Sequence, residues 1–154
     1  MAVVRILVDG YSLLHAWKEL APGEARHSAT ARQELIRQLT QYRDAIGTPL
    51  TVIFDGGGAP PNTPEPVSPD GLEVLYSKKG QTADDLIERT AYRLKPYGEA
   101  LAITNDYAER DTVIAMGGLA QSCEEFIQSI QETLREQADF VKQHNRREAT
   151  RFKR

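Results

Sequence analysis

Four short apolar runs along the chain predict β-strands. They are rich in Val, Ile and Leu, and each is bounded by Gly, Pro, Asn or Asp, as is typical of strands inside a sheet. Their ranges are 3–9, 49–55, 72–77 and 99–104. The first of them ends on an acid, which is an unusual place for a charge if the strand is buried.

Three further segments carry apolar residues at helical spacing. One lies within residues 28–47, a second lies within 82–98, and the third begins at Ser122, whose hydroxyl can cap the helix. Strands that alternate with helices favour an α/β protein with a mostly parallel central sheet covered on both faces. We therefore expect a three-layer α/β/α fold of the Rossmann-like kind.

Residues 55–71 interrupt this alternation. The stretch is too rich in Gly and Pro for regular structure, which predicts a surface loop after the second strand. Its glycines are not followed by Gly-Lys-Ser/Thr and no helix begins there, so they do not form a nucleotide phosphate-binding motif.

The composition favours one compact domain. Of the 154 residues, 40% are hydrophobic and 27% are charged, which argues against both disorder and insertion in a membrane. The N-terminal residues lack the features of a secretion signal. The single cysteine, Cys123, cannot form an internal disulfide, which favours a reducing compartment, and we expect the protein to be cytoplasmic.

The net charge of −3 conceals an uneven distribution. Residues 142–154 hold six Lys or Arg and one acid, whereas the rest of the chain is acidic. We accordingly divide the chain into a domain over residues 1–135 and a basic helix end and tail over 136–154. Such a tail is either a solvated end or an arm that binds phosphates, in which case Arg146 and Arg147 are candidate contacts to RNA.

Three acids follow predicted strands. Asp9, Asp55 and Asp106 each lie at or just after the carboxyl end of a strand. In an open parallel sheet these ends share one rim, where ligands bind. Taken singly, an acid after a strand is ordinary turn chemistry. Together the three carboxylates are expected to lie near one another.

More acids begin the helix in residues 82–98. Asp84 and Asp85 lie in its first turn, where the helix dipole favours them, and Glu88 follows one turn after Asp84. If these groups face the strand-end acids, the carboxylates repel one another unless a cation holds them. Carboxylate oxygens suit hard divalent ions, so the expected cofactor is Mg²⁺ or Mn²⁺.

A carboxylate-held divalent ion points to hydrolysis of phosphodiesters. The three histidines lack the context of a nucleophilic triad. Two other classes that place acids at strand ends, phosphatases with an Asp nucleophile and receiver domains, fit poorly. The phosphatases usually have a second Asp two residues after the first, where this chain has Tyr11, and a receiver needs a phosphoacceptor after its third strand.

Four segments together resemble a known family. "ILVDGYSLLHAW", "VIFDG", "YSKKGQTADDLIER" and "ITNDYAERD", in this order and spacing, are similar to the YacP-type branch of the NYN domains, which belong to the PIN-like nuclease superfamily. The resemblance covers roughly residues 3–130. It implies a PIN-like α/β/α fold and metal-dependent endoribonuclease activity on single-stranded RNA, mRNA in particular, in RNA decay or processing, with the ribosome as a further candidate partner.

The resemblance also implies roles for individual residues. Asp9, Asp84 and Asp106 match the family's acids and are the expected catalytic metal ligands, with water attacking phosphorus to leave 5′-phosphate and 3′-hydroxyl ends. The remaining candidates are Asp85 and Glu88 as further ligands, Asp55, Glu109 and Ser12 as orienting groups, and Lys78, Lys79 and Tyr107 as RNA contacts.

Ser12 departs from the family pattern. The family usually has asparagine at this position, and serine is shorter with a single donor, so water positioning or activity is expected to differ. This departure and the basic tail leave open an alternative, a non-catalytic RNA-binding or ribosome-associated module that retains the fold.

Overall fold

A computed structural model describes residues 3–56 and 72–152 of the chain, with side chains described to residue 149. All but the first two residues of the loop expected at 55–71 therefore lie outside the described residues. No helix in the described part is both long enough and apolar enough to cross a membrane.

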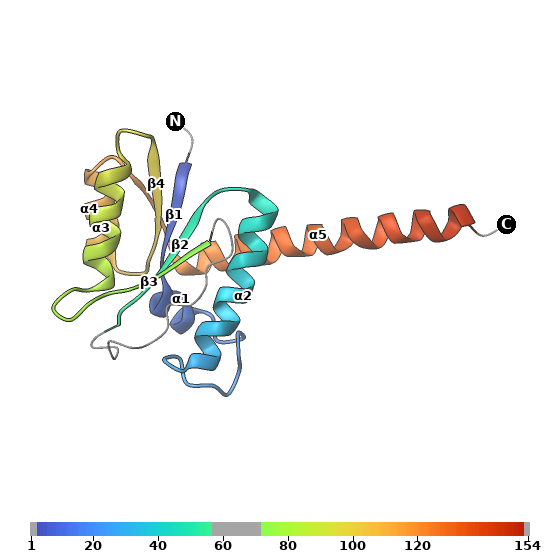
Figure 1. Cartoon of the computed structure of the whole chain (residues 1–154), viewed down its shortest axis with the longest axis horizontal. Helices are drawn as coiled ribbons and strands as arrows, with labels where there is room; N and C mark the ends of the chain where they lie inside the picture. The colour runs from blue at the N-terminus through green and yellow to red at the C-terminus, as the bar shows by residue number, and fades with distance from the viewer. Residues whose placement is uncertain (1–2, 57–71, 153–154) are drawn as a thin grey trace.

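Five parallel strands form one central sheet (Figure 1). The strands are β1 (Val3–Asp9), β2 (Leu50–Phe54), β3 (Leu72–Tyr76), β4 (Glu99–Ile103) and β5 (Leu119–Gln121). Their order in the sheet is β3-β2-β1-β4-β5. The chain therefore adds β2 and β3 on one side of β1, and then adds β4 and β5 on the other side. This leaves a switch point between β1 and β4, where ligands bind in open sheets of this kind.

Helices cover both faces of the sheet. They are α1 (Gly10–Ala16), α2 (Ala29–Ile46), α3 (Ala83–Leu94), α4 (Tyr107–Ala115) and α5 (Cys123–Phe152). Helices α1, α2 and the first half of α5 pack on one face, and α3 and α4 pack on the other (Figure 1). The three-layer α/β/α expectation is confirmed, and the described sheet is parallel throughout.

Alternation along β1 decides which way its last residue faces. Ile6 and Val8 pack into the core beneath α1, α2 and α5, whereas Leu7 packs into the core beneath α3 and α4. Because side chains alternate between the two faces of a strand, Asp9 lies on the same side as Leu7. The strand therefore directs its terminal carboxylate toward the α3–α4 layer.

The apolar pattern did not reveal α4 or β5. In α4 the only buried side chains are Glu109 and Val113, so a single buried apolar residue leaves no period to detect. The strand β5 has three residues, none of them buried, at the edge of the sheet. Both elements are therefore stabilised by their contacts with neighbouring elements, and their own sequences carry no regular apolar pattern.

Gly10 lets the chain turn closely over the core. A Cβ at this position would meet ring atoms of Phe54 at 2.4 and 2.5 Å, and Phe54 is fully buried. Gly10→Ala should therefore destabilise the fold by about 1 to 3 kcal/mol, because the ring has no space into which to move. Urea unfolding should show a lower midpoint at unchanged slope.

A double mutant separates this clash from a general effect on the turn. Phe54→Leu removes the ring atoms that the new methyl group would meet, so the cost of Gly10→Ala should be smaller in the Phe54→Leu background. Strictly additive costs would show that the Phe54 contact is not the cause.

Candidate metal centre

Asp9 lies where β1 passes into α1. Its backbone is extended, and its carboxylate caps α1 by accepting a hydrogen bond from the amide of Ser12 at 3.2 Å. Among the described residues the cap uses Oδ1 alone, so the second oxygen is available to other partners. The residue thus ends one element, begins the next, and points toward the opposite layer.

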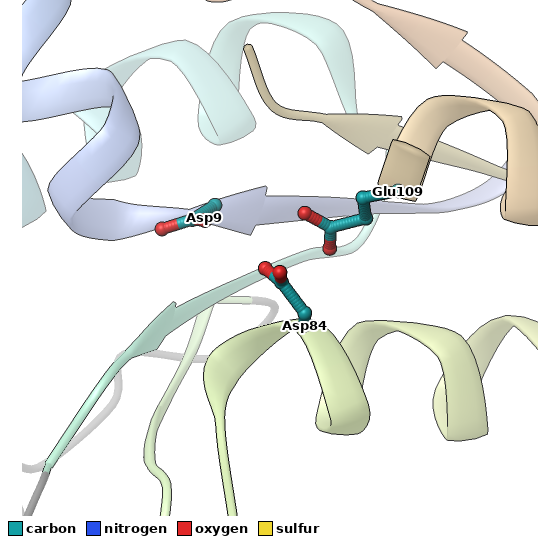
Figure 2. A group of neighbouring side chains, drawn as sticks. All are labelled: Asp9, Asp84 and Glu109. Atoms are coloured by element: carbon teal, nitrogen blue, oxygen red, sulfur yellow. The ribbon is translucent and has the colours of Figure 1, made fainter. Parts of the chain in front are cut away.

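Asp84 comes from the first turn of α3. Thr82 caps this helix, and its hydroxyl accepts from the amide of Asp85, while the Asp85 carboxylate accepts from the amide of Thr82 at 3.1 Å. This capping box uses Asp85 for the helix itself. It leaves Asp84, one residue earlier, free to face the end of β1 (Figure 2).

Glu109 comes from the first turn of α4. It is only 3% exposed, and it lies one turn before the buried Val113 on the inner face of the helix. One carboxylate oxygen from each of Asp9, Asp84 and Glu109 lies within 4.8 Å of the others. Figure 2 shows the carboxylates of Asp84, from α3, and Glu109, from α4, facing each other, with Asp9 beside them at the end of β1.

The protonation of this group is strongly perturbed. Burial, and to a lesser extent the adjacent carboxylate of Asp84, raise the pKa of Glu109 from 4.5 to about 9. Burial also raises the pKa of Asp9 from 3.8 to about 6, against the lowering effect of the Ser12 amide. Without a cation, the site therefore keeps a proton on Glu109 at neutral pH.

The donor set fits a divalent cation. Within the described residues, no group makes a hydrogen bond of ordinary geometry to either oxygen of Glu109, although Asp84 and Thr104 lie near enough to shift its pKa, Asp84 upward and Thr104 downward. A buried carboxylate without a partner is costly, and a hard cation among three carboxylates would relieve that cost. Asp9, Asp84 and Glu109 are the residues that would hold such an ion.

Asp106 serves a different local purpose. It is the cap of α4, and one of its oxygens accepts from the amides of Ala108 at 2.9 Å and Glu109 at 3.4 Å. Its charge still raises the pKa of Asp9, so it lies near the group. The three converging carboxylates therefore include Glu109 rather than Asp106. The sequence could have identified Glu109 as an inward-facing acid from its position one turn before Val113, but only if α4 had first been recognised as a helix.

The other predicted acids surround the group. Asp55 follows β2, accepts a hydrogen bond from the buried Ser77 at 3.0 Å, and raises the pKa of Asp9. Glu88 is half-buried one turn after Asp84 on α3. Neither belongs to the set of three whose oxygens converge.

Ser12 connects the site to neighbouring elements through hydrogen bonds. Its hydroxyl accepts from the amide of Asn105 at 3.2 Å and from the Cys123 thiol at 3.5 Å. Burial raises the pKa of Cys123 to about 11, so the sulfur stays protonated and can donate. The serine thus links α1 to the end of β4 and the start of α5, and sequence inspection had not identified Cys123 or Asn105 as parts of this network.

The predicted RNA contacts fall into two places. Lys78 and Lys79 are exposed in the turn before α3, and Tyr107 is 74% exposed at the start of α4 with the Arg110 guanidinium over its ring. These three residues border the elements that supply Asp84 and Glu109. Arg146 and Arg147 lie instead on the exposed far half of α5, which extends away from the sheet (Figure 1).

Comparison with known proteins identifies the family. A family model described as the YacP-like NYN domain matches residues 6–154. The chain belongs to this family. Its members are nuclease-type domains, and the family resemblance seen in the four sequence motifs is confirmed.

The chain is similar to YacP proteins both in sequence and in structure. The chain is 28% identical over 127 residues to "Uncharacterized protein YacP" of Bacillus subtilis, covering 82% of this chain and 74% of that protein. It is also similar to the crystal structure of Rae1 (YacP) from Bacillus subtilis, with TM-score 0.78 and 26% identity over 97% of this chain and 85% of the other. A mutant form of Rae1 gives TM-score 0.76 and 27% identity, covering 92% and 83% of the two chains.

The raised pKa of Glu109 predicts how stability depends on pH. The folded state holds a proton up to about pH 9 that the unfolded state releases near pH 4.5, so the metal-free protein should lose stability as pH rises through this window. Glu109→Gln removes the contribution of Glu109, leaves the smaller contribution of Asp9 below about pH 6, and should stabilise the metal-free protein at pH 7 by on the order of 3 kcal/mol. Urea unfolding in chelator at several pH values measures both effects.

The matched control is Glu136→Gln, on the exposed part of α5. It should change neither the stability at pH 7 nor its pH profile. Adding Mn²⁺ should raise the melting temperature of the unaltered protein more than that of Glu109→Gln, because the ion binds the three-carboxylate form. An unaltered protein with a flat pH profile would contradict the assignment.

Proposed function

We propose that this chain is a metal-dependent endoribonuclease that hydrolyses single-stranded RNA, with mRNA as the expected substrate. The observation that carries the proposal is the convergence of Asp9, Asp84 and Glu109 at the switch point of a nuclease-type fold. The missing hydrogen-bond partners of buried Glu109 support a cation at this place.

A bound Mg²⁺ or Mn²⁺ would lower the pKa of a water and neutralise charge on the phosphate under attack, giving 5′-phosphate and 3′-hydroxyl ends. The protein's own contribution is to hold the carboxylates in place. The caps at Asp9 and Asp106 and the capping box at Thr82 fix the starts of three helices, and these starts carry or adjoin the carboxylates. Rigid placement of this kind is what metal-assisted displacement requires.

Residues beside the site are suited to a single strand. Lys78 and Lys79 offer two exposed cations for phosphates, and the exposed Tyr107 ring offers a face on which a base can stack. A flexible single strand can reach the carboxylates more readily than a stacked duplex can, because its phosphates are not held in helical register.

The carboxylates should be indispensable for cleavage. Asp9→Asn and Asp84→Asn should each lower the rate on end-labelled single-stranded RNA by at least about 100-fold, because each removes charge from the ion's ligand set. Asp44→Asn, an exposed change at the end of α2, is the matched control and should keep the rate. Excess chelator should stop the unaltered enzyme, and Mn²⁺ should restore it.

Equal cleavage with and without chelator would overturn the metal-dependent mechanism. RNA binding without cleavage, in Mn²⁺ and at every pH tested, would favour the alternative of a non-catalytic RNA-binding module.

The two lysines before α3 should contribute to affinity rather than to chemistry. Replacing Lys78 and Lys79 with alanine should weaken RNA binding and reduce the slope of log affinity against log salt by about 1.4, as expected for two lost phosphate contacts on a single strand. The maximal rate should stay within a few-fold. Lys95→Ala, at the far end of α3, is the control, and an unchanged slope in the double variant would exclude the contact.

A further inference from the structure

The second half of α5 has no neighbour in the described structure. The first half packs into the core through Phe126, Ile127 and Ile130. From Arg135 to Arg147 every residue is exposed, and the helix extends away from the domain (Figure 1). A short helix standing alone in water is marginally stable, so this segment gains from a partner. We call residues 140–149, which hold three bases and one acid, the arm.

Charge is distributed unevenly along α5. Residues 123–139 hold five acids and one base, whereas residues 140–152 hold four bases and one acid. The arm also exposes Phe140, at 70%, and Val141, at 50%. The arm therefore carries basic and apolar side chains that are exposed and have no ion-pair or packing partner within the described structure.

An open groove lies at the base of the arm. It has a volume of about 1030 Å³ and runs between α5, α2 and the segment joining α1 to α2. Trp17, Leu20, Pro22 and Leu134 supply apolar lining. The charged lining residues are Glu19, Glu24, Glu34 and Arg135. The groove is thus suited to a segment with apolar and basic side chains, the composition of the arm.

The same face of α5 lines the groove and continues along the arm. Leu134 and Arg135 line the groove, and helical spacing places Ala138, Lys142 and Arg146 on the continuation of that face. The arm of one chain cannot fold back into its own groove, because the helix is continuous from Cys123 to Phe152. It can reach the groove of another chain.

We propose that two copies of this chain associate through their α5 helices, which lie antiparallel so that each arm occupies the groove of the other copy. If the helices cross near Ala138, Arg146 of one chain lies close to Gln131 of the other, because the two residues are about 12 and 10 Å from the crossing. The arm's Lys142 and Arg146 then face the partner's Glu19 and Glu24. The antiparallel order also sets the acidic first half of each helix beside the basic second half of the other.

RNA is the other polymer that the basic arm could bind. A second copy fits better, because the groove carries three glutamates that repel phosphates and an apolar lining that phosphates do not require. The dimer accounts for both unpartnered features, the arm and the groove, with one contact.

Exchanged charges test the contact directly. One variant carries Lys142→Glu with Arg146→Glu, and the other carries Glu19→Lys with Glu24→Lys; all four side chains are exposed. Light scattering after size exclusion, at tens of micromolar, should give twice the 17.2 kDa chain mass for the unaltered protein and a single chain mass for each variant alone. An equimolar mixture of the variants should return to twice the chain mass, because both arm–groove pairs become complementary again.

The control variant is Arg93→Glu with Lys95→Glu, an equal change of charge on exposed residues of the opposite layer, which should remain a dimer. Circular dichroism checks that each variant is folded. An unaltered chain that stays monomeric, or an arm variant that stays dimeric, would falsify the proposal. A monomeric chain whose arm variant loses affinity for single-stranded RNA would assign the arm to RNA instead.

Discussion

Mutual repulsion among carboxylates is the constraint around which this protein is organised. Asp9, Asp84 and Glu109 come from one strand and two helices, and their oxygens lie within 4.8 Å at the end of the sheet. Burial is the main reason why the pKa values of Asp9 and Glu109 rise, and repulsion from the neighbouring carboxylates, which little water screens, adds to the rise. A fold holds such a group only if a proton or a cation balances the charge.

Helix caps supply the rigidity that holds the group together. Asp9 caps α1 and Asp106 caps α4, so two acids at strand ends also fix the direction in which the chain leaves the sheet. At α3 the two functions are divided between neighbours, with Asp85 in the capping box and Asp84 facing the site. Each cap satisfies backbone amides that would otherwise lack partners. Local helix formation and assembly of the site therefore depend on the same few residues.

The fold followed from the sequence more completely than the site did. Four of the five strands and the long helices carry regular apolar patterns, and their alternation is sufficient to predict the three layers. The strand-end position of Asp9 and the helix-start position of Asp84 follow from the same pattern. Glu109 was placed only as an orienting group, because α4 has almost no apolar period and so its inward face could not be recognised.

The sequence by itself determined which acidic residues could lie at the rim of a parallel sheet, because strand ends and helix starts are local features. Only the tertiary structure decided which of them converge. That choice depends on the alternation of side chains along β1, on the packing of α3 and α4 against one face of the sheet, and on the hydrogen bonds that hold Asp85 and one oxygen of Asp106 in helix caps. These are relations between elements distant in the chain, and no local pattern encodes them.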